Sequence, residues 1–98
     1  MATFETLPHF EASWRKLTRE QQAAFRAVVL EAFEPDLMTP DRPFQRILRV
    51  RQVAGHPGLF EMTWSHDGRA TFSYGSEHVA GQPHVVWQDI VAIAGSSR

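Results

Sequence analysis

The chain of 98 residues contains no cysteine, which excludes a disulfide framework, thiolate metal ligands, iron–sulfur clusters and a cysteine nucleophile. It has no apolar run near the roughly 20 residues that cross a bilayer. Residues 1–5 have neither the basic start nor the apolar stretch of a signal peptide. We therefore expect a cytoplasmic protein without a membrane partner.

Aromatic residues are well represented, with seven Phe and three Trp in a chain that is 43% hydrophobic. A chain of this length buries only about 60–65% of the surface that it exposes when unfolded, so it depends on a dense core. We expect one globular domain spanning residues 1–98, with residues 94–98 as a frayed tail.

The formal net charge of −1 argues against a nucleic-acid partner, because a phosphate backbone favours a basic surface. The charge is unevenly placed, however. Residues 42–69 hold five arginines against two acidic residues, a balance of +3. These arginines are Arg42, Arg46, Arg49, Arg51 and Arg69. Their planar guanidinium groups suit phosphate oxygens, although arginines also populate ordinary solvated faces.

The first elements combine a short strand with a helix. Residues 3–7 alternate polar and apolar side chains, which predicts a strand. Pro8 fits the first turn of a helix, and Phe10, Trp14 and Leu17 follow at helical spacing. We expect a short amphipathic helix after the strand.

A second helix is indicated by a capping box formed by Thr18 and Gln21. An apolar stripe with helical spacing runs from Phe25 to Phe33. The residue before a proline is displaced from helical geometry, so Pro35 predicts the helix end near residues 33–34.

The apolar period then changes from 3.6 to 2, which indicates strands. We expect strands at residues 47–53, 59–64, 69–74 and 84–91, a turn at 55–58, and a tight hairpin turn at Asp67-Gly68. The predicted fold class is α+β, with two layers: an N-terminal strand and a helical hairpin packed on an antiparallel sheet of about four strands.

Period-2 arithmetic divides the strand residues between two faces of the sheet. The aromatic face is expected to be buried, although an exposed Tyr74 or Trp87 could stack on a base. The opposite face collects Arg49, Arg51, Glu61, Thr63, Arg69, Thr71, Ser73, His84 and Gln88. This set is more polar and more cationic than water exposure alone requires.

Several kinds of site are disfavoured by spacing. The five histidines show no paired metal-ligand spacing, so we expect no metal and no cofactor. Ser65, His66 and Asp67 are neighbours in a tight turn, which fits no catalytic triad. A cationic patch without a metal does suit one reaction, the cleavage of RNA by its own 2′-hydroxyl group.

The segments 48–51, 57–64, 67–74 and 84–87 resemble the RelE/ParE superfamily of toxin–antitoxin toxins, and most of all its actinobacterial RelE-like branch. The resemblance spans about residues 4–90. It implies a RelE-like fold and a ribosome-dependent mRNA endoribonuclease. In such toxins, cationic residues before the central strand and an arginine on the next strand stabilise the scissile phosphate. These positions correspond to Arg49, Arg51 and Arg69.

The resemblance leaves the acid and base of the reaction open. Related toxins usually end their last strand with a basic, His or Tyr residue, whereas this chain continues with aliphatic residues at 90–94. His84 and Glu61 are the candidates by chemistry. The implied partners are a cognate antitoxin, the ribosome and mRNA.

A second interpretation keeps the fold and drops the nuclease chemistry. It is a ParE-like toxin acting on DNA gyrase, or an inactive member that binds a partner.

Overall fold

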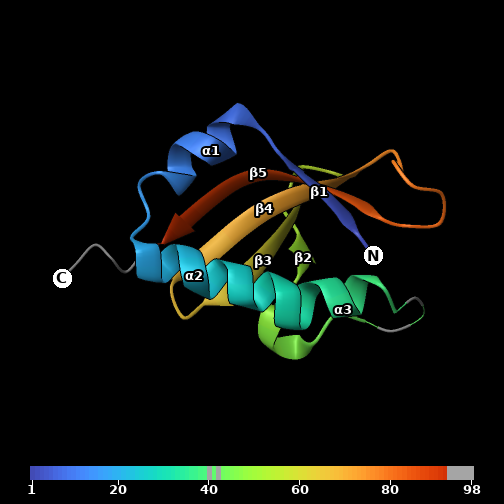
Figure 1. Cartoon of the computed structure of the whole chain (residues 1–98), viewed down its shortest axis with the longest axis horizontal. Coiled ribbons are helices and arrows are strands. Elements are labelled where there is room, and N and C mark those ends of the chain that lie inside the picture. The colour runs from blue at the N-terminus through green and yellow to red at the C-terminus, as the bar shows by residue number, and fades with distance from the viewer. Residues whose placement is uncertain (40, 42, 93–98) are drawn as a thin grey trace.

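The computed structural model describes residues 1–39, 41 and 43–92, and it places them in one sheet with a long helical path along one face and a short helix beside the opposite end of the sheet (Figure 1). The strands are β1 (Thr3–Thr6), β2 (Arg51–Gln52), β3 (Phe60–Ser65), β4 (Gly68–Gly75) and β5 (His84–Ala92). The helices are α1 (Pro8–Trp14), α2 (Arg19–Val28) and α3 (Glu34–Leu37), with a π-helical segment at Val29–Phe33 and a 3-10 helix at Arg46–Leu48.

The sheet has five strands in the order β1-β5-β4-β3-β2. β1 runs parallel to β5, and the other neighbours are antiparallel. The predicted α+β class is confirmed. The predicted N-terminal strand joins the sheet as its edge, and the short β2 forms the other edge, so the sheet is mixed and has one strand more than expected.

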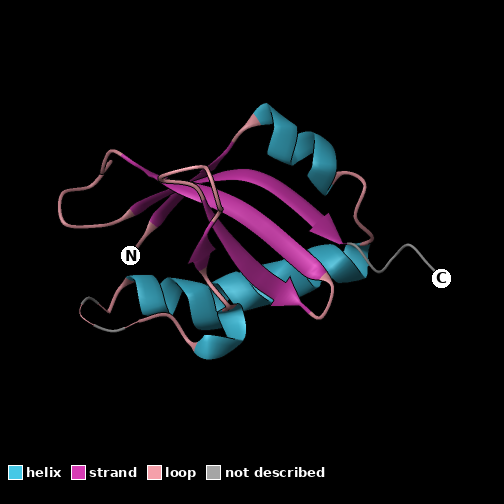
Figure 2. Ribbon diagram, turned by 180° about the vertical axis from the view of Figure 1, so that it is seen from behind, coloured by secondary structure: helices cyan, strands magenta, loops and turns pink. Residues whose placement is uncertain are grey.

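One face of the sheet packs against α2, as the two opposite views show (Figures 1 and 2). The predicted capping box is present: Thr18 and Gln21 each bond the backbone N–H of the other. Phe25 and Phe33 from the helical layer contact Trp87 of β5 at ring-centroid distances of 5.1 and 5.3 Å. The predicted aromatic core therefore lies between the helices and the sheet.

The predicted helix end at residues 33–34 is wrong. The N–H of Glu34 bonds to the carbonyl of Val29, five residues earlier, which widens the turn into a π-helix. Pro35 then falls in the first turn of α3, where its missing N–H is tolerated. The helical path consequently continues to Leu37.

The predicted strand at residues 47–53 is mostly wrong. Residues Arg46–Leu48 form a 3-10 turn, and Arg49 follows in the left-handed region with φ of 48° and ψ of 44°. Leu48 is buried, with 2% of its surface exposed, so the turn is held by the core. Only Arg51–Gln52 pairs with β3.

The predicted hairpin at Asp67-Gly68 is confirmed, with Ser65 and Gly68 as the last pair of β3 and β4. Gly68 is required by close packing, because a Cβ there would lie 2.5 Å from Cε2 of Trp64.

In β5 the pairing with β4 shifts between Trp87 and Asp89. This bulge lets both Trp87 and Ile90 face the core although they are three residues apart.

Within the described part of the chain, no helix combines the length and the apolar character needed to cross a bilayer. The predicted frayed tail at residues 94–98 and the predicted basic residue Arg42 lie outside the described residues.

Candidate functional site

A polar face of the sheet lies opposite the α2 layer and faces the viewer in Figure 2. The pairing of residues on neighbouring strands determines which side chains lie next to each other on this face. Glu61 pairs with Thr71, and Thr71 pairs with Asp89 on the next strand. Thr63 pairs with Arg69 in the adjacent row. The predicted alternation along β3 and β4 is thus correct, because side chains directly opposite each other share a face.

Arg51 and Glu61 form an ion pair across β2 and β3, with 3.1 Å between a guanidinium nitrogen and Glu61 Oε1. The Arg51 side chain is 72% exposed, so water screens most of this attraction. The predicted placement of Arg49 and Arg51 on one strand face is wrong, because the left-handed turn at Arg49 ends the alternation.

Arg49 and Arg69 instead both line a hollow of about 380 Å³, which lies between the helical layer and the hairpin end of the sheet. Apolar lining comes from Val28, Ala32, Ile47, Leu48 and Trp64, and polar lining comes from Arg49, Thr63, Ser65, His66 and Arg69. We call this hollow the arginine pocket. Two arginines and one histidine thus line the same hollow as five apolar residues.

The Arg69 side chain is anchored to the hairpin. Its Nη1 donates to the backbone carbonyls of Gly68, Ser65 and His66 at 2.9, 3.4 and 3.5 Å. Among the described residues its Nη2 and Nε have no hydrogen-bond partner. The guanidinium group is therefore positioned by the turn while keeping N–H donors for a ligand.

A second, smaller hollow of about 200 Å³ lies on the other side of Arg69, lined also by Glu61, Thr71 and Asp89. Sequence reasoning missed Asp89. Its Oδ1 accepts a 2.6 Å hydrogen bond from Ser13 Oγ, and its Oδ2 lies 3.4 Å from His9 Nε2. His9 and Ser13 are four residues apart on α1, and that spacing was the available signal.

His84 lies far from the arginine pocket, which corrects the expectation of a shared site. It pairs with Gly75, six residues along β4 from Arg69, or about 20 Å at the rise of a strand. Only 2% of its surface is exposed. Its ring bonds to Thr3 Oγ1 and Glu5 Oε1, both at 2.7 Å.

The two aromatic candidates for base stacking differ. Trp87 is 3% exposed and belongs to the core, so the expectation that it could stack on a base is wrong. Tyr74 is 48% exposed. Partial burial beside Phe60 and Phe72 raises the pKa of the Tyr74 hydroxyl above its usual value. This residue remains neutral at physiological pH.

No protein-family model matches the chain, and no curated protein matches its sequence. Solved structures do match it. The conserved hypothetical protein HP0894 from Helicobacter pylori has a TM-score of 0.60 at 9% identity, over 95% of this chain and 96% of that one. A copper-bound mutant toxin from the same organism has a TM-score of 0.60 at 11% identity, over 99% of this chain and 100% of the toxin.

A third match is to the crystal structure of the Escherichia coli DinJ–YafQ complex. The TM-score is 0.57 at 8% identity, and the match covers 100% of both chains. The matches cover almost the whole chain, but the sequence identities are very low. They therefore establish a common fold and nothing further. The RelE-like fold implied by the sequence resemblance is confirmed.

Proposed function

We propose that this chain is the toxin of a type II toxin–antitoxin pair, and that it cleaves mRNA on the ribosome without a metal ion. The observation that carries the proposal is the arginine pocket, in which Arg49, Arg69 and His66 line one hollow. The fold supports it, since the chains that share this fold include proteins described as toxins.

The two arginines supply the electrostatic part of the mechanism. Guanidinium N–H groups of Arg49 and Arg69 would bind the non-bridging oxygens of the scissile phosphate. The 2′-hydroxyl oxygen attacks phosphorus, and the bond from phosphorus to the 5′-oxygen breaks. Negative charge grows on the non-bridging oxygens as the new bond forms, so fixed donors stabilise the transition state more than the ground state.

His66 is assigned the proton transfer because it lines the same hollow as Arg49 and Arg69. An imidazole either accepts the proton of the 2′-hydroxyl or donates one to the departing 5′-oxygen. His66 takes this role from His84 because it shares the pocket with both arginines. Glu61 and Asp89 line the neighbouring hollow with Arg69, and either carboxylate can serve the second proton transfer. The products are a 2′,3′-cyclic phosphate and a 5′-hydroxyl.

The proposed protein partner is an antitoxin, since YafQ is found in a toxin–antitoxin complex with DinJ. Ile47 lines the arginine pocket and is 77% exposed. An apolar residue of an antitoxin that packs on Ile47 would cover Arg49 as well, which would block substrate entry.

The test is growth of bacteria in which the chain is induced alone. We expect growth arrest with the wild type and at least a tenfold recovery of colony counts with Arg49→Ala, Arg69→Ala or His66→Gln. Arg46→Ala is the matched control, because Arg46 is exposed on the same turn but does not line the pocket. Equal arrest by all variants would contradict the assignment of the pocket.

A ParE-like action on DNA gyrase, or an inactive partner-binding role, is the second candidate. It is favoured by the net charge of −1 and by the aliphatic end of β5, where Ile90, Val91 and Ala92 stand. A gyrase supercoiling assay separates the two candidates. Inhibited supercoiling with intact message would favour the gyrase candidate.

A further inference from the structure

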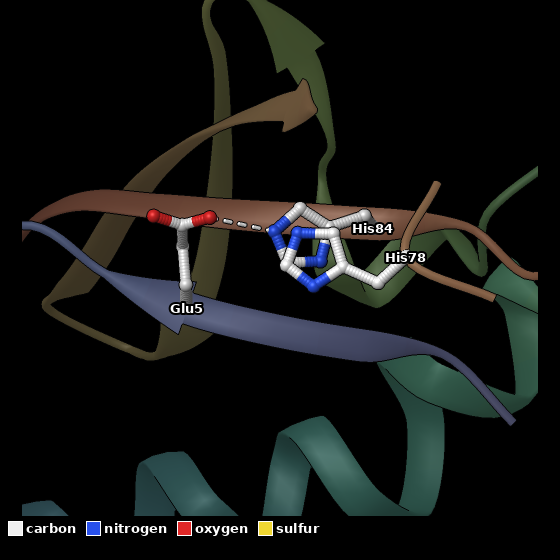
Figure 3. A group of neighbouring side chains, drawn as sticks. All are labelled: Glu5, His78 and His84. Atoms are coloured by element: carbon white, nitrogen blue, oxygen red, sulfur yellow. Dashed lines mark hydrogen bonds and ion pairs between the residues drawn. The ribbon is translucent and has the colours of Figure 1, made fainter. Parts of the chain in front are cut away.

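Three potential metal ligands meet at the end of the sheet remote from the arginine pocket. Glu5 comes from β1, His84 from the start of β5, and His78 from the loop that joins β4 to β5 (Figure 3). One ligand atom of each residue lies within 4.8 Å of those of the other two. We propose that these residues bind a divalent first-row transition-metal ion of the zinc type.

The surroundings of His84 are those of an oriented metal ligand. Its Nδ1 lies 2.7 Å from Thr3 Oγ1, and its Nε2 lies 2.7 Å from Glu5 Oε1. In the metal-bound form of a neutral imidazole, Nε2 would coordinate the ion and the single ring proton would be on Nδ1, which donates to Thr3 Oγ1. Thr3 thus fixes the tautomer and the ring plane of the ligand.

Burial further restricts this ring. His84 is 2% exposed, and a Cβ at Gly75 would lie 2.8 Å from its Cδ2. Burial and close packing against Gly75 restrict the imidazole, whereas Glu5 and His78 are exposed. The site would thus combine one buried ligand, His84, with two exposed ligands, Glu5 and His78.

The position of His78 is the strongest sign of a site. Its ring stacks on His84 with centroids 3.8 Å apart and planes 19° apart. His78 is exposed, and one of its ring nitrogens already lies within 4.8 Å of ligand atoms of Glu5 and His84. The two rings and the carboxylate converge in Figure 3.

The ligand set defines the class of ion. Two imidazoles and one carboxylate suit Zn²⁺, Cu²⁺ and Ni²⁺, whereas Mg²⁺ and Ca²⁺ prefer oxygen ligands. Three protein ligands leave a position for water. The ion would join β1, β5 and their neighbouring loop, which are far apart in sequence, and so stabilise the edge of the sheet. It would take no part in cleavage, because Arg69 lies about 20 Å away along β4.

The first test is zinc titration of the untagged chain by calorimetry, together with thermal unfolding. We expect one ion per chain, and a rise in Tm of about 10 °C or more when free zinc is 100-fold above Kd. His78→Gln should weaken zinc binding at least tenfold. His56→Gln is the matched control, because His56 is also an exposed loop histidine but is not part of the cluster.

Replacing His84 could unfold the chain, so the second test uses Glu5→Gln and spectroscopy. Cu²⁺ bound to the wild type should show spin coupling to two imidazole nitrogens, and to one in His78→Gln. Glu5→Gln should weaken binding while leaving two imidazoles. Absence of zinc binding, equal zinc affinity in His78→Gln and wild type, or a copper signal unchanged by His78→Gln would overturn the proposal.

Discussion

At the scale of single residues, Arg49 combines an unfavourable backbone with a chemically useful side chain. Its φ of 48° lies in the left-handed region, which costs a residue with a Cβ about 1–2 kcal/mol. Such strain is tolerated where the surroundings fix it, here by the buried Leu48 beside it. The turn directs Arg49 to the pocket that contains Arg69.

Arg49→Gly separates stability from function. Glycine relieves the strain but is more flexible in the unfolded chain, so the two effects offset each other. We expect the free energy of unfolding in urea to stay within about 0.5 kcal/mol of the wild type while toxicity is lost. Arg51→Gly, in the extended strand β2, should instead lose about 0.5–1 kcal/mol. Larger destabilisation by Arg49→Gly than by Arg51→Gly would contradict this account.

Individual residues also show where sequence reasoning succeeds. Thr18 and Gln21 form the predicted cap, and Gly68 forms the predicted hairpin, because both signals depend only on near neighbours in sequence. For His66, the sequence predicts only a position in a tight turn. Its proximity to Arg49 depends on a contact between the 3-10 turn and the hairpin, which no local pattern contains.

At the scale of elements, the β3–β4 hairpin positions the site. Arg69 is held by the carbonyls of the turn, and the turn is packed against Trp64 by Gly68. A change at Gly68 should therefore affect both the fold and the pocket.

Gly68→Ala tests this coupling. A Cβ at 2.5 Å from Cε2 and 2.7 Å from Cδ2 of Trp64 cannot be accommodated without moving the indole ring or the turn. We expect a loss of about 1–3 kcal/mol in the free energy of unfolding, measured by urea denaturation. A stability equal to that of the wild type would show that the hairpin adapts at no cost.

Two elements differed from expectation for reasons of tertiary structure. The helical path continues beyond Pro35 because a π-helical turn precedes this proline. Residues 47–50 do not form a strand because Leu48 packs in the core. The spacing of apolar residues in the sequence predicts neither the π-turn nor the burial of Leu48. The parallel pairing of β1 with β5 could not be predicted from local patterns either, because it joins residues about 80 positions apart in the sequence.

At the scale of the whole molecule, the charge distribution predicts how the chain meets RNA. The net charge of −1 gives little long-range attraction, so binding should rely on the local contacts of Arg49 and Arg69.

Salt dependence tests this picture. Each phosphate of a single strand that is neutralised contributes a slope of about −0.7 to the plot of log affinity against log salt. Two arginine contacts therefore predict a slope of about −1.4 for a single-stranded RNA, measured by fluorescence anisotropy. Arg69→Ala should halve the slope, and Arg46→Ala should leave it unchanged. A slope several times steeper would indicate a wider basic surface.

The central claim is cleavage of message by the arginine pocket, and a translation extract with purified chain tests it most directly. We predict that ribosome-bound message is cut to fragments with 2′,3′-cyclic phosphate ends. Arg49→Ala and Arg69→Ala should slow the cutting by about 100-fold, as the loss of one charge-stabilising donor typically does. Arg46→Ala should cut like the wild type. Intact message with the wild-type chain, in an extract where a control nuclease cuts, would contradict the account.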